Sequence, residues 1–98
     1  MQNYKYDFSI VVPIYNEIKN LSPLTDSIMN ELNEDKYNYQ IIYVDDGSQD
    51  GTSQKIDLLQ EKIDKLSAIH FTENNGQTAA FLAGFQRSGR RVYSNFRC

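Results

Sequence analysis

Two adjacent carboxylates, Asp45 and Asp46, are the residues whose types and spacing best suggest chemistry in this chain. They directly follow residues 39–44, YQIIYV, whose β-branched and aromatic side chains predict a strand buried on both faces of a parallel sheet. Gly47 and Ser48 come next and predict a turn. Because ligands of open α/β sheets bind outside the carboxyl ends of the strands, the two aspartates are candidates for metal binding, acid–base chemistry or ligand recognition.

Two further apolar runs predict strands at residues 8–12 and 67–72, on either side of the strand at 39–44 in the sequence. Pro13 follows the first run and is expected to end that strand, because proline cannot donate a hydrogen bond to a neighbouring strand. The chain should therefore contain three strands, each separated from the next by enough residues for a helix.

Three segments, two amphipathic and one largely apolar, predict helices after these strands. The first is expected to begin with Ser22 as N-cap and Pro23 as first helical residue, and the second after Asp50 or Thr52. The third, residues 77–85, is apolar nearly all round and should be more buried than the other two. The β-α-β-α-β-α order predicts an α/β fold, a Rossmann-like parallel sheet with right-handed crossovers.

Composition limits the function classes. The chain has 98 residues, enough for one short domain, and its net charge of −3 provides no basic surface for nucleic acid. The one cysteine, Cys98, excludes an internal disulfide and is consistent with a reducing compartment. Because neither a signal peptide nor a run of ~20 apolar residues is visible, we expect a cytoplasmic chain without a membrane segment.

Polar residues follow all three predicted strands, at residues 13–17, 45–48 and 74–77. In a parallel sheet these three segments emerge at the same edge and can converge on one ligand. A dinucleotide-binding Rossmann domain is disfavoured, because the first strand is not followed by the G-x-G-x-x-G fingerprint.

Three motifs carry a family resemblance: VVPIYNE at residues 11–17, VDDGSQDGT at 44–52 and NNGQTAAFLAGF at 74–85. In order and spacing they resemble the N-terminal nucleotide-binding half of family 2 glycosyltransferases of the GT-A fold. They are most similar to the branch that transfers sugars to polyprenyl phosphates, namely dolichyl or undecaprenyl phosphate. The resemblance implies a nucleoside diphosphate sugar, UDP- or GDP-linked, as donor and a lipid phosphate as acceptor.

The resemblance also implies roles for individual residues. Tyr15 would line the base, Asp46 would accept a hydrogen bond from it, and Glu17 would lie close to the nucleoside. Pro13 would shape the turn and Asp45 would brace the loop. These are suitable chemical types, since a base needs a planar apolar surface and an acceptor for its ring N–H.

A second group of residues, Asn75 to Gln77, precedes the third predicted helix, whose N-terminal amides suit a diphosphate. Gly76 would allow close approach of the backbone to the ligand and Gln77 would begin the helix. Each feature also has an ordinary structural explanation, as solvated turns, a surface tyrosine or a first-turn carboxylate. Their joint occurrence after three successive strands favours the nucleotide-binding interpretation.

The resemblance covers residues 8–86, which leaves 1–7 as a polar lead and 87–98 as a non-matching tail. The family's Mg²⁺ or Mn²⁺ site, an Asp-x-Asp motif on a fourth strand, is not found. We therefore expect no metal ligand and no catalytic residue in this chain, and no activity of the chain alone. The tail suggests the hypothesis of a frame shift, because Asn95–Cys98 can be encoded so that the next frame reads Thr-Leu-Asp.

A different class of function stays open, a non-catalytic nucleotide-binding module or a receiver-like α/β interaction module with an acidic pocket for Mg²⁺. A receiver, however, should carry acidic residues after its first strand and a phosphate-accepting aspartate after its third. Here these strand ends carry PIYNE at residues 13–17 and ENNGQ at 73–77, so the order does not fit a receiver. His70 is interpreted as structural or incidental. The uncovered edge of so short a sheet predicts association with other strands.

Overall fold

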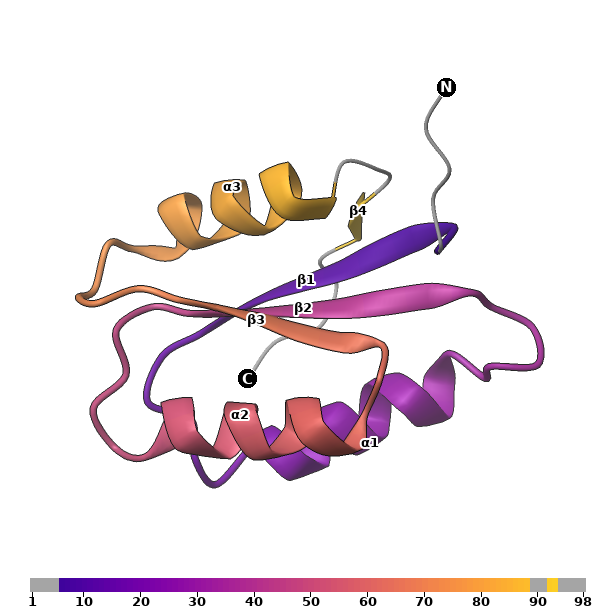
Figure 1. Cartoon of the computed structure of the whole chain (residues 1–98), viewed down its shortest axis with the longest axis horizontal. Coiled ribbons are helices and arrows are strands. Elements are labelled where there is room, and N and C mark those ends of the chain that lie inside the picture. Colours follow the sequence, from indigo (N-terminus) through magenta and orange to yellow (C-terminus); the bar gives the residue numbers. More distant parts are fainter. Residues whose placement is uncertain (1–5, 89–91, 94–98) are drawn as a thin grey trace.

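The computed structural model describes residues 6–88 and 92–93. The strands and helices follow one another as β1 (Phe8–Ile14), α1 (Leu21–Glu31), β2 (Tyr39–Asp45), α2 (Thr52–Lys62), β3 (Leu66–His70), α3 (Gln77–Ser88) and β4 (Val92–Tyr93). In this part of the chain the sheet has the order β3-β2-β1-β4, and all its pairings are parallel. Helices α1 and α2 cover one face and α3 the other (Figure 1). The predicted Rossmann-like parallel sheet is confirmed.

Several element ends differ by a few residues from the prediction, and two of the differences involve prolines. β1 continues through Pro13 to Ile14. In the described chain β4 pairs with β1 only at Ser9 and Ile10, so the stretch around Pro13 pairs with β2 alone. Proline is tolerated at such an edge position of a sheet. Helix α1 begins at Leu21, two residues before Pro23. Proline is tolerated there because the first N–H groups of a helix have no partner within the helix.

Strand β4 corrects the expectation that no strand follows the third helix. Val92 and Tyr93 pair in parallel with Ser9 and Ile10 of β1. Helix α3 continues to Ser88, so ordered structure extends well into the segment expected as a tail from residue 87. A strand of two residues is too short to give a sequence pattern. The frame-shift hypothesis concerns Asn95–Cys98, which lie outside the described residues.

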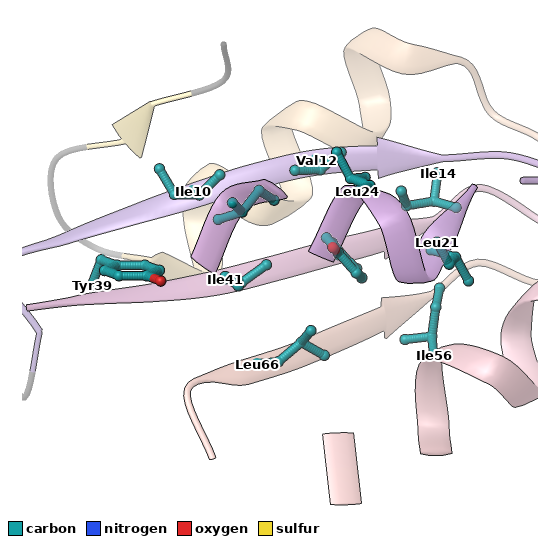
Figure 2. Packing of buried hydrophobic residues seen from close by; sticks show 11 residues of the cluster. Ile10, Val12, Ile14, Leu21, Leu24, Tyr39, Ile41, Ile56 and Leu66 are labelled. Atoms are coloured by element: carbon teal, nitrogen blue, oxygen red, sulfur yellow. The ribbon is translucent and has the colours of Figure 1, made fainter. Parts of the chain in front are cut away.

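The larger part of the core lies between the sheet and helices α1 and α2. β1 alternates, so that Ile10, Val12 and Ile14 face these helices while Val11 faces α3. The buried side chains of this cluster are shown in Figure 2: Ile10, Val12, Ile14, Leu21, Leu24, Ile28, Tyr39, Ile41, Tyr43, Ile56 and Leu66. Each large apolar side chain that is fully buried contributes roughly 1.5–3 kcal/mol. This packing fixes β1 and β2, and thereby the loops that follow them.

Helix α3 is less buried than expected. Its buried positions are the small residues Ala80, Gly84 and Ser88, whereas Leu82 and Phe85 are 53% and 52% exposed. The reason is geometric: Ala80, Gly84 and Ser88 recur every four residues, and this small-residue face lets the helix approach the sheet closely. The prediction that α3 is the most buried helix is therefore wrong.

Replacing Gly84 with alanine is expected to lower the free energy of unfolding by about 1–3 kcal/mol through overpacking, although alanine favours a helix by about 1 kcal/mol. The added Cβ would lie 3.1 Å from Cγ2 of the fully buried Val11 and closer still to Cγ1. Urea unfolding measures the change. Gln86→Ala, at an exposed position of α3, is the control. A Gly84→Ala variant as stable as the wild type would contradict this packing.

Candidate functional site

The loops that follow β1 and β2 are tied together at the carboxyl edge of the sheet. Asn16, in the left-handed region with φ of 51°, donates its N–H to Ser48 Oγ at 2.9 Å and accepts the N–H of Gln49 at 2.8 Å. Glu17 donates its N–H to Thr52 Oγ1 at 3.0 Å. These side chain to backbone bonds fix the first loop against the second.

Asp46 connects the second loop to the third. Its carboxylate accepts the N–H of Asn75 at 2.6 Å and the N–H of Gly76 at 2.9 Å. The residue is 3% exposed, and its own N–H donates to Ile14 O at 2.8 Å. A buried carboxylate therefore holds the start of α3 beside the ends of β1 and β2. All three loops meet at one edge, on the left of Figure 1.

Asp45, by contrast, is fully buried and its carboxylate is used inside the protein. It accepts the N–H of Ser48 at 2.9 Å, the hydroxyl of Ser53, and a bond from Nδ1 of His70 at 2.9 Å. Burial alone would raise the pKa of Asp45, but the hydrogen bonds from Ser53, Ser48 and His70 lower it below its ordinary value. Asp45 is thus an ionised carboxylate that braces the turn at its own strand end.

The other predicted site residues lie on the loops after β1 and β3, at the start of α3 or, for Pro13, within β1. Tyr15 is 46% exposed, which leaves a planar surface free beside the loops. Oε2 of Glu17 accepts a hydrogen bond from the side chain of Asn20 at 2.7 Å. Gly76 has φ of +93°, and the place of its missing side chain faces open space, while the exposed Gln77 begins α3. Pro13 lies within β1, in register with Val44.

Sequence reasoning missed four residues that organise these loops: Asn16, Ser48, Thr52 and His70. The signal for the first three was available, because Asn, Ser and Thr side chains commonly bond to nearby loop backbone. His70 had no such signal. Its role depends on the register that places it opposite Asp45 in the sheet.

Metal ligation does not fit the described residues. Within 6–88 and 92–93, no three or more His, Cys, Asp or Glu side chains gather in a group that could hold a metal ion. In the same residues, no helix is long and apolar enough to cross a membrane. A cavity of about 460 Å³ lies at the opposite, amino edge of the sheet, lined by residues that include Tyr37, Lys62 and Lys65. The predicted site residues do not line it.

The chain is similar to curated transferases that act on polyprenyl phosphates by name. The chain is 37% identical over 79 residues to undecaprenyl-phosphate 4-deoxy-4-formamido-L-arabinose transferase of Aeromonas hydrophila, covering 80% of this chain and 24% of that protein. It is 34% identical over 80 residues to dolichol-phosphate mannosyltransferase of Saccharomyces cerevisiae, covering 81% and 30%. The chain thus spans about a quarter of the length of these curated relatives.

A solved structure is also similar. A mannosyltransferase from Pyrobaculum calidifontis, determined in complex with GDP-Man and Mn²⁺, superimposes with a TM-score of 0.71 at 26% identity. The match covers 86% of this chain and 25% of that one, in agreement with the GT-A fold. The sequence profile described as Glycosyl transferase family 2 matches residues 9–93, which include β4. The chain therefore belongs to glycosyl transferase family 2.

Proposed function

We propose that this chain supplies the donor-nucleotide side of a glycosyltransferase that moves a sugar from a UDP- or GDP-linked donor to a polyprenyl phosphate. Family membership and the names of the relatives support the reaction class. The observation that carries the assignment to this edge is the buried Asp46 carboxylate, which ties the loop before α3 to the loop after β2.

Each predicted residue has a place in this proposal. The exposed ring of Tyr15 packs against the base, and Glu17 lies beside the nucleoside. A carboxylate offers about four acceptor positions, so Asp46 retains capacity for a base N–H while it holds two backbone amides. The open side of Gly76 and the first amides of α3, from Gln77 on, face the diphosphate.

In the whole enzyme, an oxygen of the lipid phosphate attacks the anomeric carbon in a single displacement, and the nucleoside diphosphate leaves. The residues of this chain bind and orient the donor for that step. The solved relative's Mn²⁺ suggests a divalent ion for the whole enzyme, although no group of the described residues fits such an ion. Alone, the chain should bind nucleotide weakly and transfer no sugar.

The partners and the location follow from the same proposal. The proposed partners of the whole enzyme are the nucleoside diphosphate sugar and the lipid phosphate. A further partner could pair with β3, which lies at one edge of the described sheet. We place the chain in the cytoplasm, which its single cysteine supports.

Calorimetric titration of the chain with UDP, GDP and Mg²⁺ tests the proposal. Base-dependent binding of a nucleoside diphosphate is the expected result. Binding of Mg²⁺ without any nucleotide preference would instead support a receiver-like module, and transfer of sugar by the chain alone would contradict its assignment as the donor side only.

Replacing Tyr15 with alanine is expected to weaken nucleotide binding roughly tenfold, because stacking of one base on an aromatic ring contributes about 1–3 kcal/mol. Tyr15→Phe keeps the ring and should bind within about twofold of the wild type. Tyr37→Ala is the matched control, since Tyr37 is similarly exposed, at 42%, but lies at the opposite edge. Equal losses in Tyr15→Ala and Tyr37→Ala would argue against a base platform at Tyr15.

A further inference from the structure

His70 of β3 connects strand β2 to helix α2 next to the candidate site. Its Nδ1 lies 2.9 Å from Oδ2 of Asp45, the residue opposite it in the sheet, and its Nε2 lies 2.8 Å from Oδ1 of Asp57 on α2. The Asp45 side chain is 1% exposed and that of Asp57 is 62% exposed. The imidazole thus bridges a buried carboxylate and a surface carboxylate.

This geometry is fully satisfied in one protonation state only. A neutral imidazole carries one N–H, so one ring nitrogen would present its lone pair to a carboxylate oxygen. The imidazolium donates from both nitrogens and also offsets two negative charges. Burial alone would lower the pKa of His70, but the hydrogen bonds to Asp45 and Asp57 and the charges of both raise it above the 6.5 of a free histidine.

The carboxylate that His70 holds is part of the candidate site. Asp45 accepts the N–H of Ser48, and Ser48 Oγ accepts the N–H of Asn16, next to Tyr15. The residue after His70, Phe71, donates its N–H to Asp45 O at 2.8 Å at the start of the third loop. A short path of hydrogen bonds therefore leads from the imidazole to the loops that would contact the nucleotide.

We propose that His70 is a positioning residue of the donor-nucleotide site, and that its protonated ring clamps Asp45 to Asp57 and so holds the loops after β1 and β2 in their binding geometry. This inference rests on the proposed function. It adds a residue that does not touch the nucleotide and a dependence of binding on pH.

The direction of the pH effect follows from the raised pKa. The clamp is complete at pH values well below the ordinary histidine pKa of 6.5, and it is lost as pH rises through the raised pKa of the folded protein. With the ring neutral, Asp57 swings into solvent and the loops spend less time in the binding geometry. Apparent affinity falls with that fraction. Loss of one such hydrogen bond predicts a weakening of roughly 2- to 10-fold.

Few other charges act on this ring. Among the described residues, the charged groups bonded to it are Asp45 of β2 and Asp57 of α2. Arg87 of α3 reaches β3 at the carbonyl of Ala68, at 3.4 Å, rather than at the imidazole. Since the chain contains a single histidine, its titration is seen as one imidazole signal by NMR.

The test measures affinity for GDP and UDP at several values between about pH 6 and about pH 8.5, in the wild type, His70→Gln and Asp57→Asn. As pH rises, the affinity of the wild type should fall more than that of His70→Gln. The fall seen in His70→Gln measures the contribution of the titrating ligand phosphate. Asp57→Asn should lose this dependence, because an amide N–H satisfies the neutral ring. Glu61→Gln is the control. It removes an exposed carboxylate from the same helix as Asp57 and should behave as the wild type.

A second readout uses reciprocity: if protonation favours binding, saturating nucleotide must raise the NMR-measured pKa of His70 further. A ring that is merely structural would show no such shift. The same pH dependence in wild type and His70→Gln, or an unchanged imidazole titration on binding, would overturn the positioning role alone. Failure to bind either nucleotide at any pH would overturn the proposed function and this inference with it.

Discussion

In the Asp46→Ala variant, the affinity for nucleotide is expected to fall at least about tenfold. Its free energy of unfolding is expected to fall by about 3 kcal/mol. Two backbone amides, of Asn75 and Gly76, donate to this buried carboxylate, and alanine leaves both without an acceptor. Hydrogen bonds to charged groups contribute roughly 1.5–3 kcal/mol each, so the loop before α3 should detach. Calorimetric titration with GDP and UDP and urea unfolding measure the two effects.

Two further variants separate binding from folding. Asp46→Asn keeps one oxygen acceptor, but its NH₂ group faces the other backbone N–H, and neither can accept. This variant should remain folded with reduced stability and still bind nucleotide poorly. Asp26→Ala removes an exposed aspartate from α1 and should change neither property. Wild-type binding by Asp46→Asn and Asp46→Ala would show that the edge around Asp46 is not the nucleotide site.

The Gly47→Ala variant is expected to lose more than about 3 kcal/mol, enough to unfold a substantial fraction of so small a domain. Gly47 has φ of +75°, a conformation that costs other L-residues roughly 1–2 kcal/mol. An added Cβ would also lie 2.6 Å from Asn74 N and 2.8 Å from Glu73 Cα. Since these are backbone atoms, the third loop must move. Circular dichroism during urea unfolding measures the loss.

Gly76→Ala is the matched control for this variant. Gly76 has φ of +93°, but an added Cβ there meets nothing within 4 Å. It should therefore cost only the backbone strain, about 1–2 kcal/mol. The difference between the two variants isolates the close approach of the second and third loops. Equal losses in both would contradict that approach.

The pattern of apolar runs and amphipathic segments was sufficient to predict β1 to β3 and the helices between them, because β1 and β2 are largely buried and the helices are amphipathic. It could not predict β4, whose two residues contribute only a few backbone contacts to β1. It also gave the wrong burial for α3. Leu82 and Phe85 were expected in the core, but the helix packs on the sheet through Ala80 and Gly84. Which face turns inward was decided by small residues that permit close packing, and not by hydrophobicity.

The site was predictable as a set of loops but not as a network of bonds. Strand order placed residues 13–17, 45–48 and 74–77 at one edge, as the structure has them. The sequence could not indicate that Asp46 would bind the amides of Asn75 and Gly76, because this depends on how closely two loops approach. The contacts of Tyr15 and Asp46 with a base, and the place of Glu17 close to the nucleoside, remain predictions.

The central claim is that the carboxyl edge of the sheet binds a nucleoside diphosphate, and an NMR titration of the isotope-labelled chain with GDP and UDP tests it most directly. We predict saturable shifts of the amide signals of Tyr15, Asp46 and Gly76 and of their loop neighbours. Signals around the cavity at the amino edge, lined in part by Tyr37 and Lys65, should stay unchanged. Shifts confined to that cavity, or no saturable shift with either nucleotide, would contradict the claim.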